Sequence, residues 1–170
     1  MKIGVLSDTH DQYENIRKAV TVLKKERVEL VVHCGDWVSP FTLAFYKDLA
    51  CPIKGVFGNN DGDRFLHPIR AKDFGLTIEF EERVLTLEVD NRKIFVYHGD
   101  YGEVTDALVS SGKYDAVFHG HTHISVNQLV GKTLSLNPGT LMPFTSEEVH
   151  DASFAIYDTK TNSARLLKVI

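Results

Sequence analysis

The sequence predicts an α/β protein built from two packed sheets with helices on the outside. In the first half of the chain, short apolar runs alternate with amphipathic helical segments, as in the strand–helix–strand units of a parallel sheet. In the second half, alternating apolar segments are separated by tight-turn residues, which is the pattern of β-hairpins. No repeat, linker or low-complexity segment divides the chain, so we expect a single domain that spans residues 1–170.

The first half of the chain is predicted to alternate strands and helices. Ile16, Val20 and Leu23 recur at the spacing of an amphipathic helix that packs on a sheet. Leu30-Val31-Val32 is a continuous apolar run, which is typical of a strand buried on both faces in a parallel sheet. In order, we expect strand 2–6, helix 15–25, strand 30–32, helix 41–49 and strand 52–57.

The second half is predicted to consist mainly of hairpins. The signal is weak between residues 63 and 82, where we expect only a short helix over 65–72. Asp90-Asn91 is a tight-turn sequence between two alternating segments. The other expected elements are hairpin strands 84–89 and 93–97, helix 104–111, strand 115–118, hairpin strands 125–129 and 133–136, a long polar loop up to residue 150, and paired strands 154–158 and 164–169.

The composition and charge exclude several classes of protein. No apolar run approaches the length of a membrane span, and the amino terminus lacks the apolar region of a signal peptide, so we expect a cytoplasmic protein. The net charge of −4 argues against broad binding of nucleic-acid polymers, which requires a basic face. Cys34 and Cys51 form no close pair, and we expect both to be reduced and buried.

Polar residues follow the predicted strands at the points where these strands end. Because open α/β sheets gather their ligand sites at the carboxyl ends of the strands, we expect these residues to lie close together. The potential metal donors at these positions are Asp8, His10, Asp36, Asn59, His98, His121 and His123. All of them offer oxygen or nitrogen and none is a thiolate. Seven donors are too many for one tetrahedral ion but suit two ions that share a carboxylate.

The same motifs also have structural interpretations. Asp8 or Asp11 can cap the following helix, and residues 58–61 can form an ordinary turn. His121 and His123 are two positions apart, so both can point to one side if the backbone stays extended. The alternative for these two histidines is exposure to solvent at the end of a strand.

Two further residues near these motifs have less defined roles. His33 precedes the glycine turn at the end of its strand, so we interpret it as a packed core histidine rather than a ligand. Arg64 follows the loop that carries Asn59 and can reach a phosphate, although a solvated surface arginine is the simpler interpretation.

The strand-end motifs resemble those of a known family. They are Asp8-x-His10, Gly35-Asp36, Gly58-Asn59-x-Asp61, His98-Gly99 and Gly120-His121-x-His123. In this order, and over nearly the whole chain, they are similar to the signature of the calcineurin-like metallophosphoesterases. The resemblance implies a four-layer α/β/β/α sandwich of two mixed sheets. The small size and the Asn137-Pro138-Gly139 segment are similar to the compact phosphodiesterase branch of bacteria and archaea.

The resemblance also implies a role for each donor. It assigns one ion to Asp8, His10 and His123, the second ion to Asn59, His98 and His121, and the bridge between them to Asp36. The chain departs from the family at Asn60, where larger members carry a histidine that protonates the leaving group. An amide cannot act as an acid, but Asn60 can hydrogen-bond a phosphate oxygen. Asp61 matches an acidic position of the family and is expected to orient a neighbour.

We therefore expect a metal-dependent phosphodiesterase that acts on a small phosphodiester. A hydroxide held by a dinuclear divalent metal centre would attack phosphorus. Manganese is the first expectation for both ions, with nickel, cobalt, zinc or iron as alternatives. The rival hypothesis is a non-catalytic protein-binding scaffold, because the same branch includes the retromer subunit family and because Asn60 is not an acid. A nuclease is a third alternative, which the acidic charge weakens; a homo-oligomer is left open.

Overall fold

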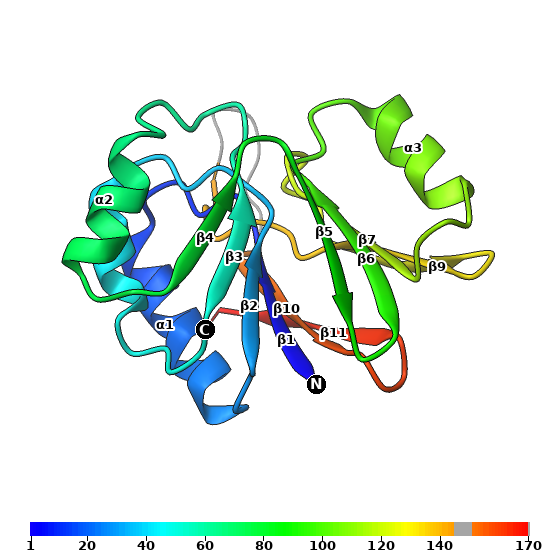
Figure 1. Cartoon of the computed structure of the whole chain (residues 1–170), viewed down its shortest axis with the longest axis horizontal. Helices are drawn as coiled ribbons and strands as arrows, with labels where there is room; N and C mark the ends of the chain where they lie inside the picture. Colours follow the sequence, from blue (N-terminus) through cyan, green and yellow to red (C-terminus); the bar gives the residue numbers. More distant parts are fainter. Residues whose placement is uncertain (145–150, 170) are drawn as a thin grey trace.

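Two β-sheets lie face to face at the centre of the protein, and helices cover their outer surfaces (Figure 1). The computed structural model describes residues 1–144 and 151–169. The helices α1 (Tyr13–Lys25) and α2 (Leu66–Asp73) lie outside the larger sheet, and α3 (Gly102–Ser110) lies outside the smaller one. The expected four-layer α/β/β/α sandwich of two mixed sheets is confirmed.

The larger sheet has a parallel centre that continues into an antiparallel hairpin. In the described residues it contains, in spatial order, β11 (Ser163–Lys168), β10 (Ser153–Asp158), β1 (Lys2–Leu6), β2 (Leu30–His33), β3 (Ile53–Val56) and β4 (Ile78–Glu81). Strands β1 to β4 run parallel, and β10 pairs antiparallel with both β1 and β11. The loops that follow β1, β2 and β3 therefore open at the same edge of the sheet.

The smaller sheet is built in the same mixed way. In the described residues it contains, in spatial order, β5 (Val84–Val89), β6 (Arg92–Tyr97), β7 (Ala116–Phe118), β9 (Thr133–Asn137) and β8 (Val126–Val130). Strands β6, β7 and β9 run parallel, while β5 and β8 form hairpins with their neighbours. Asp90 and Asn91 have φ angles of 49° and 60°, as the predicted tight turn requires.

Apolar side chains fill two layers, one between the sheets and one between the larger sheet and its helices. Val32 belongs to the layer between the sheets, whereas its neighbour Val31 contacts the helical layer. The strand β2 is thus buried on both faces, which explains its continuous apolar run. Ile16 and Leu23 of α1 are fully buried in the helical layer.

The helix expected over residues 41–49 is a shorter 3₁₀ helix, η1 (Pro40–Tyr46). Pro40, Leu43 and Tyr46 are its buried residues, and their spacing of three matches the period of a 3₁₀ helix rather than that of an α-helix. The Asp11 carboxylate binds the start of this segment, where Oδ1 accepts a hydrogen bond from Ser39 N at 2.9 Å. The predicted helix is therefore present, but it is of the 3₁₀ type and ends three residues earlier than expected.

The prediction missed strand β4 at the edge of the larger sheet. Its sequence, Ile-Glu-Phe-Glu, alternates over only four residues, which is too short for a clear signal. The short helix expected just before it is confirmed as α2. The paired strands expected at the end of the chain are confirmed as β10 and β11.

Three remaining expectations have mixed outcomes. Cys34 and Cys51 are both free, but only Cys34 is buried, while Cys51 is half-buried. The long polar loop expected before residue 151 includes residues 145–150, which lie outside the described residues. Within the described part of the chain, no helix combines the length and the apolar character needed to cross a membrane.

Candidate metal centre

The loops that follow β1, β2, β3, β6 and β7 meet at one edge of the two sheets (Figure 1). The structure brings all of the predicted donors together there: Asp8, His10, Asp36, Asn59, His98, His121 and His123. They come from both sheets, so the centre lies where the two sheets meet. The donors form two groups on either side of Asp36.

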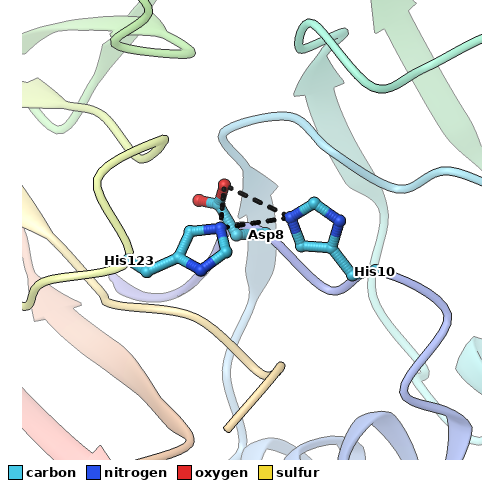
Figure 2. A group of neighbouring side chains, drawn as sticks. All are labelled: Asp8, His10 and His123. Carbon is cyan, nitrogen blue, oxygen red and sulfur yellow. Dashed lines mark hydrogen bonds and ion pairs between the residues drawn. The ribbon is translucent and has the colours of Figure 1, made fainter. Parts of the chain in front are cut away.

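Asp8, His10 and His123 form the first group and point toward one another (Figure 2). The Asp8 Oδ1 atom lies 3.3 Å from His123 Nε2 and 3.8 Å from His10 Nε2, and the two Nε2 atoms are 3.2 Å apart. Two ligands of one tetrahedral ion at ordinary bond lengths lie roughly 3.4 Å apart. This group therefore fits a single transition-metal ion.

Asn59, His98 and His121 meet on the other side of Asp36. The Asn59 Oδ1 atom lies 2.9 Å from His98 Nε2 and 3.0 Å from His121 Nδ1. Asp36 Oδ2 lies 3.5 Å from His98 Nε2 and 3.4 Å from His10 Nε2, a ligand of the first group. One carboxylate oxygen thus lies between the two groups, which is the position that a bridging ligand needs.

Hydrogen bonds from neighbouring groups hold the second carboxylate oxygen of Asp8. Its Oδ2 atom accepts hydrogen bonds from Ser7 Oγ at 2.5 Å and from the His121 backbone N–H at 2.9 Å. These bonds turn Oδ1 toward the imidazoles. Gly120 makes the approach possible, because a Cβ at this position would lie 1.9 Å from Ser7 Oγ. Ser7 was not among the predicted site residues; its place directly before Asp8, at the end of a buried strand, is the signal that identifies it.

The charges of the centre stabilise one another. Burial raises the pKa of Asp8, but contacts with His10 and His123 outweigh burial and hold this pKa well below its usual range. Burial lowers the pKa of His98, but its contact with Asp36 and the charge of Asp8 raise it to about 9. His98 is then protonated at neutral pH, so a cation bound at this imidazole would have to displace that proton, and its binding would strengthen as the pH rises.

Most of the predicted donors have an unusual backbone conformation. Positive φ angles, between 40° and 69°, occur at Asp8, His10, Asp36, His121 and His123. For residues other than glycine this region costs about 1 kcal/mol or more each, and it persists only where the surroundings enforce it. The backbone at His121 and His123 is therefore not extended, so the condition under which both side chains would point to one side is not met. The turn directs His121 toward Asn59 and His123 toward His10.

Asp61 fixes the loops that carry two of the donors. Its Oδ2 atom accepts hydrogen bonds from the backbone N–H of Asp36 at 3.0 Å and of Gly58 at 2.7 Å. Its Oδ1 atom accepts a third from Val38 N at 2.7 Å. Asp61 is buried, and these three backbone groups satisfy the hydrogen-bonding capacity of its carboxylate. Because two of them belong to the loop after β2 and one to the loop after β3, the carboxylate connects these loops.

Asn60 and Arg64 also contact this region. The Asn60 Nδ2 atom donates to Asp36 Oδ2 at 2.7 Å, and its backbone N–H donates to Asp36 Oδ1 at 2.9 Å. Arg64 donates from Nε to the Asp61 carbonyl at 3.0 Å and from Nη2 to the Gly58 carbonyl at 3.1 Å, and it pairs with Glu82. Arg64 is therefore partly buried rather than freely solvated, and its guanidinium braces the loop.

The proposed capping role of Asp11 in the first helix was wrong. The N-cap residue of α1 is Gln12, and its side chain makes no capping hydrogen bond. Asp11 Oδ1 instead accepts from Ser39 N at 2.9 Å and from Thr42 Oγ1 at 3.3 Å, at the start of η1. Asp8 does not cap α1 either, since its carboxylate faces the histidines.

His33 is the packed core histidine that the sequence suggests. Its Nδ1 atom accepts a hydrogen bond from Gly35 N at 3.1 Å, so the proton lies on Nε2, 3.2 Å from Thr9 Oγ1. Its ring stacks on Trp37 with 3.6 Å between the centroids. Burial lowers the pKa of His33 to about 3.

Acid is expected to destabilise the protein through His33. Between its ordinary pKa of 6.5 and the folded value of about 3, the unfolded chain binds a proton that the folded chain does not, so stability falls as the pH falls. A proton NMR titration should show no change of the His33 ring signals down to about pH 4, while the free energy of unfolding in urea decreases. Protonation of His33 in the folded protein near pH 6.5 would contradict this assignment.

Comparisons with known proteins identify the family. The model of the calcineurin-like phosphoesterase superfamily domain matches residues 1–162. Phosphodiesterase MJ0936 of Methanocaldococcus jannaschii is 41% identical over 143 residues, which cover 82% of this chain and 83% of that protein.

Solved structures agree with this match. The structure of a novel archaeal phosphodiesterase has a TM-score of 0.89 and 36% identity, and the alignment covers 99% of both chains. Vps29 of Entamoeba histolytica, solved in complex with Zn²⁺, has a TM-score of 0.70 over 99% of this chain and 98% of its own, but at 19% identity this likeness shows the fold alone. The match to the family over most of the chain is decisive: the protein belongs to the calcineurin-like phosphoesterase superfamily and is a phosphoesterase, a hydrolase.

Proposed function

We propose that this protein is a phosphodiesterase that uses two divalent metal ions to hydrolyse a small phosphodiester. The main support is the position of Asp36 Oδ2, which lies within 3.5 Å of imidazoles from both donor groups. The likeness to phosphodiesterase MJ0936, at 41% identity, supports the diester as substrate. The net charge of −4 favours a small substrate over a nucleic-acid polymer.

In this proposal the two donor groups hold one ion each. Asp8, His10 and His123 would hold the first ion, Asn59, His98 and His121 the second, and Asp36 both. When bound, two such ions withdraw charge from the phosphoryl oxygens and lower the pKa of a water molecule. The imidazole-rich donor set suits manganese, our first choice, and also nickel, cobalt, zinc or iron, better than it suits magnesium.

The chain's own residues give the centre its shape and charge. Asp61 and Arg64 fix the loop from Gly58 to Asp61 by hydrogen bonds to its backbone, so that Asn59 and Asn60 keep their positions. Asn60 orients the Asp36 carboxylate through two hydrogen bonds. Asn60 is also exposed, and we propose that the second hydrogen of its side-chain amide donates to a phosphate oxygen.

Two observations favour the alternative of a protein-binding scaffold. The fold matches Vps29 with a TM-score of 0.70, and Asn60 is an amide at the position where the resemblance described above implies an acid. However, a scaffold does not require left-handed backbone at five donor positions, Asp8, His10, Asp36, His121 and His123, and this conformation lowers stability. We therefore favour the enzyme.

Metal removal tests the proposed function. We expect chelated and dialysed protein to keep its fold, because the core is large enough without metal, but to lose hydrolysis of bis(p-nitrophenyl) phosphate. Mn²⁺ should restore the activity, and Mg²⁺ should restore less of it. Circular dichroism reports the fold, and nitrophenol release reports the activity. Full activity in excess chelator would contradict metal dependence.

We also propose a cytoplasmic location and a single catalytic domain over residues 1–170. Cys34 and Cys51 are both free, as is usual for proteins of a reducing compartment. The family match begins at residue 1 and extends to residue 162, so it includes elements of both sheets. Fractionation of the source cells tests the location.

A further inference from the structure

The segment that begins with the last residue of β9 has no role in the centre described so far. It consists of Asn137-Pro138-Gly139-Thr140, and Asn137 and Thr140 are both fully buried. Neither residue is a donor of the candidate metal centre. Both make hydrogen bonds to the backbone of loops that carry donors, as follows.

Asn137 holds the turn that carries His121 and His123. Its Nδ2 atom donates to the Gly120 carbonyl at 2.9 Å and to Thr122 Oγ1 at 3.1 Å. Its Oδ1 atom accepts a hydrogen bond from Gly139 N at 2.9 Å. The Asn137 side-chain amide therefore donates hydrogen bonds to the turn that carries the histidines and accepts one from its own segment. A carboxylate cannot supply this combination, because it has no hydrogen to donate.

Thr140 holds the opposite side of the same donor group. Its Oγ1 atom donates to the Asp8 carbonyl at 2.7 Å and accepts from Met142 N at 2.9 Å. The Leu141 backbone N–H donates to the same Asp8 carbonyl at 3.2 Å. Ser153 of β10 anchors the segment itself, because its Oγ atom donates to the Pro138 carbonyl at 2.8 Å.

The segment thus connects two loops that come from different sheets. Asp8 follows β1 of the larger sheet, whereas the turn from Gly120 to His123 follows β7 of the smaller sheet. Asp8, His121 and His123 all have φ angles between 49° and 69°, so each needs surrounding contacts to keep its conformation. The hydrogen bonds of Asn137 and Thr140 supply such contacts on both sides of the 3.3 Å gap between Asp8 Oδ1 and His123 Nε2.

We propose that Asn137 and Thr140 are positioning residues that set the metal affinity of the group formed by Asp8, His10 and His123. The inference rests on the proposed function, because it requires that this group binds a metal ion. Residues that orient metal ligands change affinity or activity by about 10- to 100-fold when they are replaced. A similar loss is expected here, although neither side chain is one of the seven donors of the centre.

The test compares two threonines that make similar hydrogen bonds. Thr140 donates to the Asp8 carbonyl, and Thr133, also fully buried, donates to the Tyr114 carbonyl; both distances are 2.7 Å. Thr133 lies at the start of β9 and Thr140 follows its end, so only Thr140 contacts the centre. Thr140→Val and Thr133→Val each lose a buried hydrogen bond, whereas Thr140→Ser retains the hydroxyl group.

The measurement is Mn²⁺ binding to the chelated full-length protein, by calorimetry and by electron paramagnetic resonance of the free ion. We expect Thr140→Val to weaken the binding of one ion by about 10-fold or more, Thr133→Val to leave it within about 2-fold, and Thr140→Ser to restore it. Thermal unfolding of each variant without metal reports its stability. If Thr140→Val does not fold, Ser153→Ala provides a milder change that should weaken the same ion.

Two results would overturn the inference alone: unchanged Mn²⁺ affinity in folded Thr140→Val, or an equal loss of affinity in Thr133→Val. Either result leaves the metal centre and the proposed function intact. If the unaltered protein binds no Mn²⁺, the proposed function fails and this inference fails with it. The behaviour of the unaltered protein therefore distinguishes the two failures.

Discussion

Replacing Asp36 by asparagine is expected to lower kcat/KM for an activated phosphodiester by at least about 10³-fold. Asp36 Oδ2 lies 3.4 Å from His10 Nε2 and 3.5 Å from His98 Nε2, so this one atom serves both donor groups. The substitution removes a negative charge that lowers the repulsion between two cations, while the side chain keeps its size. It also places a side-chain amide next to the amide of Asn60. In the unaltered protein Asn60 Nδ2 lies 2.7 Å from Asp36 Oδ2.

The measurement combines elemental analysis of the metal content with steady-state kinetics. Asp11→Asn is the matched control, because Asp11 lies next to a donor in the sequence while its carboxylate accepts hydrogen bonds from Ser39 and Thr42 at the start of η1. We expect this control to keep its ions and to change kcat/KM by no more than about 3-fold, since its Oδ1 atom can still accept both hydrogen bonds. Two tightly held ions in Asp36→Asn would show that Asp36 is not the bridge.

The second large effect is expected in the choice of leaving group. An amide at Asn60 cannot donate a proton as an acid does, and this amide already donates to Asp36 Oδ2 at 2.7 Å. Positioned acid catalysis is typically worth about 10²- to 10⁴-fold, so poor leaving groups should react more slowly by about this factor. A series of aryl and alkyl phosphodiesters, compared by kcat/KM at one pH and one metal concentration, should show a steep dependence on leaving-group pKa.

Asn60→His provides the complementary variant. If its imidazole reaches the leaving oxygen, the difference between aryl and alkyl diesters should narrow, with the largest gain for the alkyl substrates. A dependence on leaving-group pKa that is flat in the unaltered protein, with chemistry rate-limiting, would mean that another group supplies the proton. Asp61 is an unsuitable candidate for this, because its carboxylate is buried and accepts three backbone hydrogen bonds.

Local patterns in the sequence were sufficient to predict most of the fold. The apolar run of β2 and the Asp90-Asn91 turn depend on neighbouring residues, and both are found where they were predicted. The elements that were wrong or missed had weak local signals. The 3₁₀ helix η1 is held by the distant Asp11, and β4 is a four-residue strand at the edge of its sheet.

In the candidate site, too, the features set by neighbouring residues could be predicted, and those set by distant residues could not. Its donors follow buried strands, so their position at one edge of the sheets could be predicted from the order of strands alone. The contacts that hold these donors could not be predicted from the sequence, because such contacts join distant parts of the chain. Thr140 Oγ1 and the Asp8 carbonyl are 132 residues apart in sequence, and Asp61 and the Asp36 N–H are 25 apart. The left-handed turn at His121 likewise depends on Asn137, 16 positions later.

The most direct test of the dinuclear centre is a titration of chelated protein with Mn²⁺, in which bound metal and hydrolysis of bis(p-nitrophenyl) phosphate are followed together. Two donor groups around Asp36 should bind two ions per chain, and the activity should rise with occupancy of the second ion. Electron paramagnetic resonance should then show two Mn²⁺ ions that are magnetically coupled through the shared carboxylate. Binding of only one ion at full activity, or of none, would contradict the dinuclear centre.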